Sequence, residues 1–134
     1  MIDLNNYIGK SYELGARGPQ YFDCWGLVMS VYRDLNIALP DWTVDSTDPL
    51  TVARAMKDGI DQSLMKAYAT LIDVPRNFDI AFLLRGERAH HCGIFYNGAI
   101  LHINDDALGV VHERADRFIK TGRGFLSYYR WLGG

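Results

Sequence analysis

Cys24 is the residue whose type and setting best suit covalent chemistry. It follows a loop rich in glycine and proline, Gly15–Pro19, and apolar residues then recur at spacings of three and four as far as Leu35. This spacing predicts a helix that begins at about Asp23, whose carboxylate can accept hydrogen bonds from the unpaired amides of the first turn. Because the positive end of a helix dipole lowers the pKa of a thiol, the position predicts a nucleophilic cysteine.

A cysteine nucleophile needs a base, and the chain offers four histidines: His90, His91, His102 and His112. Asn97 and Gly98 predict a two-residue hairpin turn, because both residue types tolerate the positive φ that this turn requires. The resulting register places His91 and His102 on one face as diagonal neighbours, roughly 7 Å apart between backbone positions. His91 is therefore the predicted base and His102 the residue that orients its ring, as a cysteine hydrolase requires.

The same register makes two further predictions about the hairpin. Gly93 falls opposite His102, where we expect it to leave space for the backbone of a ligand. His90 and Cys92 fall on the opposite face, and Cys92 is expected to pack against an apolar layer.

Simpler interpretations compete with this site. A lone cysteine is most often a buried core residue, so Cys24 could have only a packing role. Zinc binding is the other alternative, but His91 and Cys92 are adjacent and point to opposite faces of a strand, whereas structural zinc sites use ligand pairs separated by two to four residues. We therefore predict no metal. Four aromatic residues are expected in core or rim packing, with contact to a sugar as the alternative: Trp25, Trp42, Tyr68 and Trp131.

The composition predicts one globular domain over residues 1–134, since 49% of the residues are hydrophobic and 22% are charged. A net charge of -2 and a pI near 6.0 give no basic surface for nucleic acid or an anionic membrane. The first ten residues include an early acid and no apolar run, so we expect neither a signal peptide nor a membrane span. Two cysteines are too few for a disulfide scaffold.

Helical patterns come first along the chain and strand patterns follow. Besides the helix that starts near Asp23, weaker helical patterns cover residues 2–8, 50–58 and 62–68, and an extended segment is expected at 70–74. Later apolar runs predict strands: Ile80–Leu84, Cys92–Tyr96, Ala99–Ile103, Val110–His112 and Phe125–Trp131. Helices followed by sequential strands predict an α+β domain with an antiparallel sheet.

Three stretches together resemble the NlpC-type cysteine peptidases: Phe22–Val28, His91–Phe95 and Ile100–His102. That family cleaves the peptide stems of the bacterial cell wall and has a papain-like core. The resemblance therefore implies a papain-like α+β fold in which the nucleophile helix packs on an antiparallel sheet. A short chain with tryptophan directly after the cysteine is most similar to the tail-assembly branch of the family, found in phages and prophages.

The resemblance also implies roles for individual residues. Cys24 would be the nucleophile, His91 the base and His102 the orienting residue. Tyr12 matches a tyrosine beside the thiol that helps to stabilise the oxyanion, as the backbone amide of Cys24 can also do. Asp23 matches a position that contacts the amino group of the substrate in some members.

Two positions depart from the pattern of the family. Trp25 stands at the substrate side where serine is common, which removes a polar contact and leaves the preferred stem peptide open. The sequence Asn77-Phe78-Asp79 stands where the family usually has Gly-Asp before a strand.

The resemblance implies a hydrolase that cuts an amide bond in peptidoglycan stem peptides and needs no cofactor. We expect it to be made in the cytoplasm without a leader and to reach the cell wall as part of a phage or prophage tail, with other tail proteins as partners. Two alternatives remain open: an interbacterial amidase effector, and a catalytically silent subunit of tail assembly.

Overall fold

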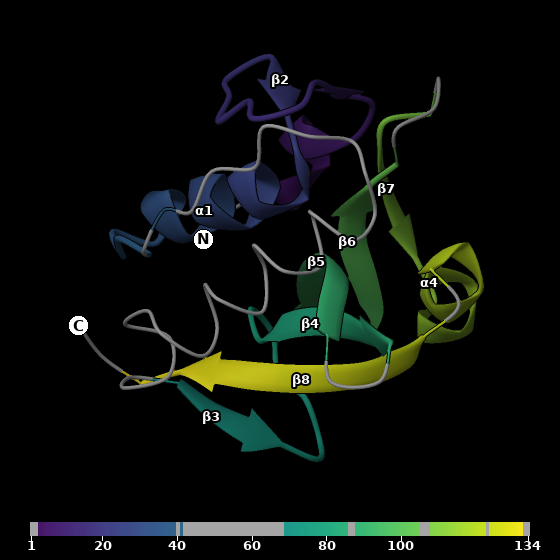
Figure 1. The fold of residues 1–134 in the computed structure, drawn as a ribbon. Coiled ribbons are helices and arrows are strands. Elements are labelled where there is room, and N and C mark those ends of the chain that lie inside the picture. The colour runs from purple at the N-terminus through teal and green to yellow at the C-terminus, as the bar shows by residue number, and fades with distance from the viewer. Residues whose placement is uncertain are drawn as a thin grey trace.

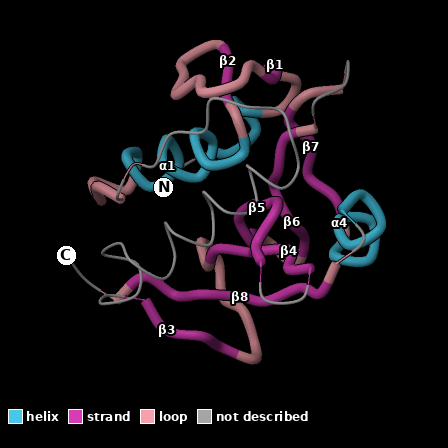
Figure 2. Tube along the Cα trace, viewed as in Figure 1, coloured by secondary structure: helices cyan, strands magenta, loops and turns pink. Residues whose placement is uncertain are grey.

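The computed structural model describes residues 3–39, 41, 69–85, 88–104, 108–122 and 124–132. A 3-10 helix and two very short strands precede one long helix, and most later elements are strands (Figures 1 and 2). In chain order they are η1 (Leu4–Tyr7), β1 (Ser11–Tyr12), β2 (Tyr21–Phe22), α1 (Cys24–Asp34), β3 (Ala69–Ile72), β4 (Ile80–Arg85), β5 (Arg88–Tyr96), β6 (Ala99–Ile103), β7 (Val110–Glu113), α4 (Ala115–Gly122) and β8 (Phe125–Trp131). The helices predicted at 50–58 and 62–68 lie outside the described residues.

The main sheet has six antiparallel strands in the order β3-β8-β4-β5-β6-β7. Helix α1 packs on β5 and β6, whereas α4 contacts β6 (Figure 1). The two short strands β1 and β2 pair separately and in parallel. The predicted α+β class, with a helix that starts at the cysteine and packs on an antiparallel sheet, is confirmed.

Helix α1 forms where the spacing of apolar residues predicted it. The Asp23 carboxylate accepts a hydrogen bond from the Gly26 amide at 2.7 Å, so Asp23 is the N-cap. Leu27, Val28 and Val31 are fully buried against the sheet. Each buried aliphatic side chain of this size contributes roughly 1.5–3 kcal/mol, which fixes the helix and the residue at its first turn.

The hairpin of β5 and β6 also has the predicted turn. Asn97 and Gly98 have φ values of 48° and 80°, as a two-residue hairpin turn of this kind requires. Ile94 pairs with Leu101, and this register follows from the turn. Strands β6 and β8 have the predicted bounds, while β5 begins four residues before the apolar run that identified it, at Arg88.

Helix α4 was not predicted. Its signal in the sequence is the spacing of Ala115, Phe118 and Ile119, which places all three on one face. Phe118 is fully buried and forms a second core cluster with residues of the sheet. Since Ala81 belongs to this cluster and its neighbour Phe82 belongs to the cluster under α1, the two helices cover opposite faces of β4.

No helix in the described part of the chain is both long enough and apolar enough to cross a membrane.

Candidate active site

Cys24 is the first residue of α1 and is a half-buried residue. Hydrogen bonds from the Cys92 thiol and the His91 imidazole, together with the positive charge that His91 can carry, lower the pKa of Cys24 to about 5. Burial and the nearby Asp23 carboxylate act in the opposite direction without reversing the effect. A thiol with this pKa is a thiolate near neutral pH, which is the reactive form of cysteine.

Cys92 holds the proton of the thiol pair. Its side chain is fully buried in the apolar cluster under α1, as the strand alternation predicted. Burial and the charge of the neighbouring Cys24 raise the pKa of Cys92 well above its ordinary value. Cys92 therefore donates its S–H to the sulfur of Cys24, a contact that the sequence did not predict because it joins a helix to a strand far along the chain.

His91 and His102 meet as the hairpin register predicted. The Nε2 atom of His91 lies 3.1 Å from the Nδ1 atom of His102, which leaves Nδ1 of His91 as the nitrogen for the thiol. A β-bulge lies directly before His91, since Leu83 pairs with His91 while Leu84 pairs with Ala89. Bulges re-aim the side chains of a strand and are frequent next to active sites.

Phe118 of α4 packs against the rings of both His91 and His102. Its ring stacks on His91 with a centroid distance of 5.3 Å and meets His102 edge to face at 4.8 Å. His102 is fully buried, and burial first, then the charge of His91, lowers the pKa of His102 to about 3. His102 is therefore a neutral partner for His91. Phe118 is a site residue that the sequence analysis missed together with its helix.

Gly93 does not have the predicted role. A side chain at this position would approach the Leu101 carbonyl oxygen to 2.6 Å and Cβ of His102 to 2.9 Å. The space beside Gly93 is thus filled by strand β6 and is closed to a ligand backbone. The absence of a side chain instead allows His102 to lie close to β5, within reach of His91.

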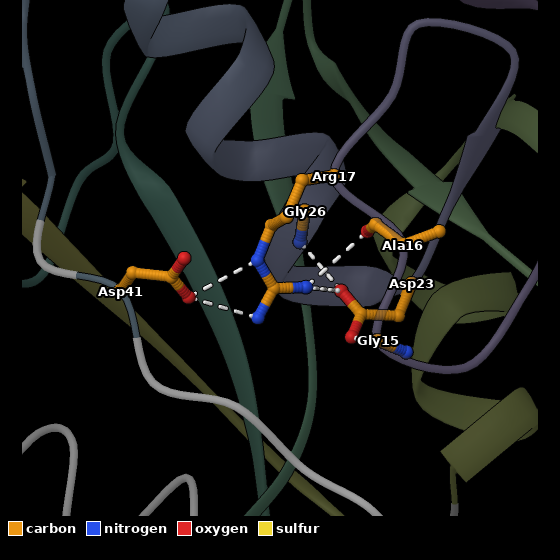
Figure 3. A network of polar contacts seen from close by, with 6 residues as sticks. All are labelled: Gly15, Ala16, Arg17, Asp23, Gly26 and Asp41. Carbon is orange, nitrogen blue, oxygen red and sulfur yellow. Dashed lines mark hydrogen bonds and ion pairs between the residues drawn. The ribbon is translucent and has the colours of Figure 1, made fainter.

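A polar network fixes the loop that leads into α1 (Figure 3). Arg17 donates to Asp23 at 2.7 Å and, through two nitrogens, to Asp41 at 3.1 and 3.0 Å. The second oxygen of Asp23 accepts from the Gly15 amide at 3.2 Å. Asp23 is 6% exposed, so its carboxylate is engaged by the chain's own donors, and contact with a substrate amino group stays a prediction.

Gly26 is required by the same network. A Cβ atom here would lie 2.2 Å from the Ala16 carbonyl oxygen, which itself accepts a hydrogen bond from the Asp23 amide at 3.1 Å. Any side chain would therefore push the loop away from the start of the helix. Gly26 lets the loop approach α1 closely enough for Arg17 to reach Asp23.

Two more predicted site residues are Tyr12, in β1, and Trp25, which follows Cys24 in the chain. Tyr12 pairs with Phe22 across the short parallel strands and packs, partly buried, against the core cluster under α1, as Cys24 also does. This position is compatible with its predicted oxyanion role, which stays a prediction. Trp25 is only 2% exposed and stacks on Phe82 with a centroid distance of 6.3 Å, so its side chain belongs to the core, as the packing interpretation predicted.

The departure at Asn77-Phe78-Asp79 has a structural counterpart. Phe78 has φ of 76°, a left-handed conformation that glycine adopts without strain. Its ring packs against Tyr96 at a centroid distance of 5.4 Å, which offsets part of the cost. The following Asp79 is buried and pairs through both oxygens with Arg130, at 3.0 and 2.9 Å.

Within the described ranges, no three His, Cys, Asp or Glu side chains gather closely enough to hold a metal ion.

Comparison with known proteins places this geometry in context. A family model described as the NlpC/P60 family matches residues 9–121, which is most of the chain. No curated protein matches.

Solved structures share the fold at low sequence identity. The NlpC/p60 domain of the peptidoglycan hydrolase SagA is 17% identical, with a TM-score of 0.59 over 92% of this chain and 90% of that one. NlpC2 and NlpC1 from Trichomonas vaginalis are each 20% identical, with TM-scores of 0.63 and 0.61. Each covers 96% of this chain, which spans 44% and 41% of theirs.

Proposed function

Because the chain belongs to the NlpC/P60 family, we propose that it is a cysteine hydrolase that cleaves an amide bond in the peptide stems of bacterial peptidoglycan. The observation that carries the proposal is the arrangement around Cys24. A thiol at a helix start, with a pKa lowered to about 5, lies beside His91, which is hydrogen-bonded to His102 at 3.1 Å. Nucleophile, base and orienting group are the three parts that a cysteine hydrolase requires.

The proposed reaction has two steps. The Cys24 thiolate attacks the carbonyl carbon of the scissile amide, and His91 gives its proton to the leaving amine as the C–N bond breaks. The resulting thioester is then attacked by water, from which His91 takes a proton. The C–S bond breaks, the acid product leaves, and Cys24 returns to the thiolate.

Two groups are our candidates for stabilising the oxyanion of each step. The Asp23 carboxylate accepts its capping hydrogen bond from the Gly26 amide and not from the Cys24 amide at the start of the helix. That amide points from the positive end of α1 and suits a developing negative charge. The Tyr12 hydroxyl is the second candidate, because Tyr12 pairs with Phe22, two residues before Cys24.

Digestion of purified murein sacculi tests the proposal. We expect the wild-type protein to release peptides that mass spectrometry identifies, and Cys24→Ala to reduce the release by at least about 10³-fold because the nucleophile is lost. His112→Gln is the matched control, since His112 is exposed and bonds the Tyr96 carbonyl outside the site. The hydrolase proposal fails if wild type and Cys24→Ala release the same products.

We further propose that the protein acts as a component of a phage or prophage tail, which would carry it to the cell wall. The support is the sequence Asp23-Cys24-Trp25-Gly26, which resembles the tail-assembly branch of the family. An antibody against the protein should label purified virions. An adjacent gene for an immunity protein would instead favour the interbacterial amidase, and virion labelling without murein digestion would favour a silent tail subunit.

A further inference from the structure

One nitrogen of the buried His102 ring has no hydrogen bond in the described part of the chain. His102 is fully buried, and its Nδ1 atom is engaged by His91. Its other nitrogen, Nε2, is buried without a hydrogen bond among the described residues. A buried polar atom left in this state costs about 1–3 kcal/mol, so its persistence calls for an explanation.

A carboxylate on strand β7 lies just beyond hydrogen-bond distance of this nitrogen. The Glu113 Oε2 atom lies 3.6 Å from Nε2 of His102. Strand β7 pairs with β6 so that Val111 is opposite His102, which puts Glu113 two residues along on the same face. The Glu113 side chain is 24% exposed, so it is partly open to solvent, whereas the His102 ring beside it is fully buried.

The tautomer of His102 links this carboxylate to the chemistry. When His91 carries a proton on each nitrogen, its Nε2–H can donate to His102 only if Nδ1 of His102 bears a lone pair. The single proton of neutral His102 must then be on Nε2, facing Glu113. In the opposite tautomer, the Nε2 lone pair would face a carboxylate oxygen, which is repulsive.

We propose that Glu113 is a positioning residue that extends the site to Cys24–His91–His102–Glu113 and holds His102 in the tautomer with its proton on Nε2. This inference rests on the proposed hydrolase function. A separation of 3.6 Å is too long for a hydrogen bond in the resting site. Hydrogen bonds of this kind shorten when charge develops, and the charge on His91 would draw the Nε2–H toward Glu113.

The charges of the groups around His102 allow the role of Glu113 to be tested separately from a purely structural role. Side chains from three elements face His102: His91 from β5, Glu113 from β7 and the uncharged ring of Phe118 from α4. Glu113 therefore supplies the negative charge in this set of contacts. Its removal should change the tautomer of His102 and the turnover rate while leaving substrate affinity unchanged.

Three variants and one control test the inference. We expect Glu113→Ala to lower kcat on murein peptides by about tenfold or more, with KM within twofold, because the orientation of the base is lost. Glu113→Gln, which keeps an acceptor oxygen, and Glu113→Asp, which keeps the charge, should each recover part of kcat. Asp116→Asn is the control, since Asp116 is an exposed acid paired with Arg114 and should leave kcat unchanged.

Nitrogen-15 NMR of the histidine rings gives a second readout that needs no catalysis. Wild-type His102, identified by comparison with His102→Gln, should show the tautomer with its proton on Nε2, and Glu113→Ala should show a mixture. A wild-type His102 with its proton on Nδ1, or an unchanged tautomer in Glu113→Ala, overturns the inference. If the wild type digests no murein, the proposed function fails, while the NMR result still decides the role of Glu113.

Discussion

At the scale of single residues, the site depends on where one proton lies between two sulfur atoms. Cys92 is buried and keeps its proton, while Cys24 at the helix start loses its own. Cys92 stands between the predicted base and Gly93, and it was expected only to fill the apolar layer. Its S–H is the first cause of the low pKa of Cys24, ahead of the His91 imidazole.

Cys92→Ala should therefore raise the pKa of Cys24 from about 5 toward its ordinary value. A thiolate forms above its pKa, so alkylation of Cys24 by iodoacetamide should slow by about two- to tenfold at pH 6, where the wild type is already ionised. The rate is measured against pH, with peptide mass spectrometry to locate the label. Cys92→Ser keeps a donor and should retain most of the shift. An identical pH profile in Cys92→Ala would exclude the role of Cys92.

At the scale of elements, the loop from Gly15 to Asp23 and the start of α1 form one unit. Asp23 binds the Gly26 amide, the Arg17 guanidinium and the Gly15 amide at the same time. Gly26 permits the close approach on which these contacts depend. The unit holds Cys24 in place, so Asp23 has a structural role whether or not it also contacts substrate.

Asp23→Ala should lower the free energy of unfolding by about 2 kcal/mol, because it removes a helix cap and leaves buried donors unpaired. Asp23→Asn keeps a neutral cap and should lose less. Asp41→Ala removes only the exposed partner of Arg17 and should change stability by less than about 1 kcal/mol. Urea denaturation measures all three. Wild-type stability in Asp23→Ala, together with lost activity, would instead assign Asp23 to the substrate alone.

At the scale of the whole molecule, folding buries a histidine that is neutral. His102 lies between β5, β7 and α4, and burial lowers its pKa to about 3 from an ordinary 6.5. Between these values the unfolded chain binds a proton that the folded chain does not. Stability from this group is therefore complete above about pH 6.5 and is lost as the pH falls toward 3.

Acid should destabilise the wild type through His102 by at most about 1.4 kcal/mol per pH unit in this window. His102→Gln removes the titrating group, so its stability should fall less steeply between pH 6.5 and pH 3, the window set by the two pKa values. Urea denaturation at several pH values measures the slopes. His112→Gln is the control for an exposed histidine and should follow the wild type. Equal slopes in wild type and His102→Gln would show that His102 does not titrate as described.

The sequence by itself determined the parts of the site that depend on local rules. The apolar spacing and Asp23 defined the start of α1, because a capped helix needs only neighbouring residues. The Asn97-Gly98 turn defined the register of its hairpin, because a two-residue loop leaves one pairing of the strands. Together these identified Cys24 and the His91–His102 pair.

Only the tertiary structure decided which other residues meet them. Cys92, on a strand, contacts Cys24, on a helix. Phe118 contacts His91 from the helix that follows β7. The position of Glu113 beside His102 depends on the register of β6 and β7, which no tight turn fixes. The role predicted for Gly93 failed because strand β6 fills the space beside it, which the register alone does not reveal. Each of these contacts joins different elements, and packing of whole faces, which local spacing does not encode, brings them together.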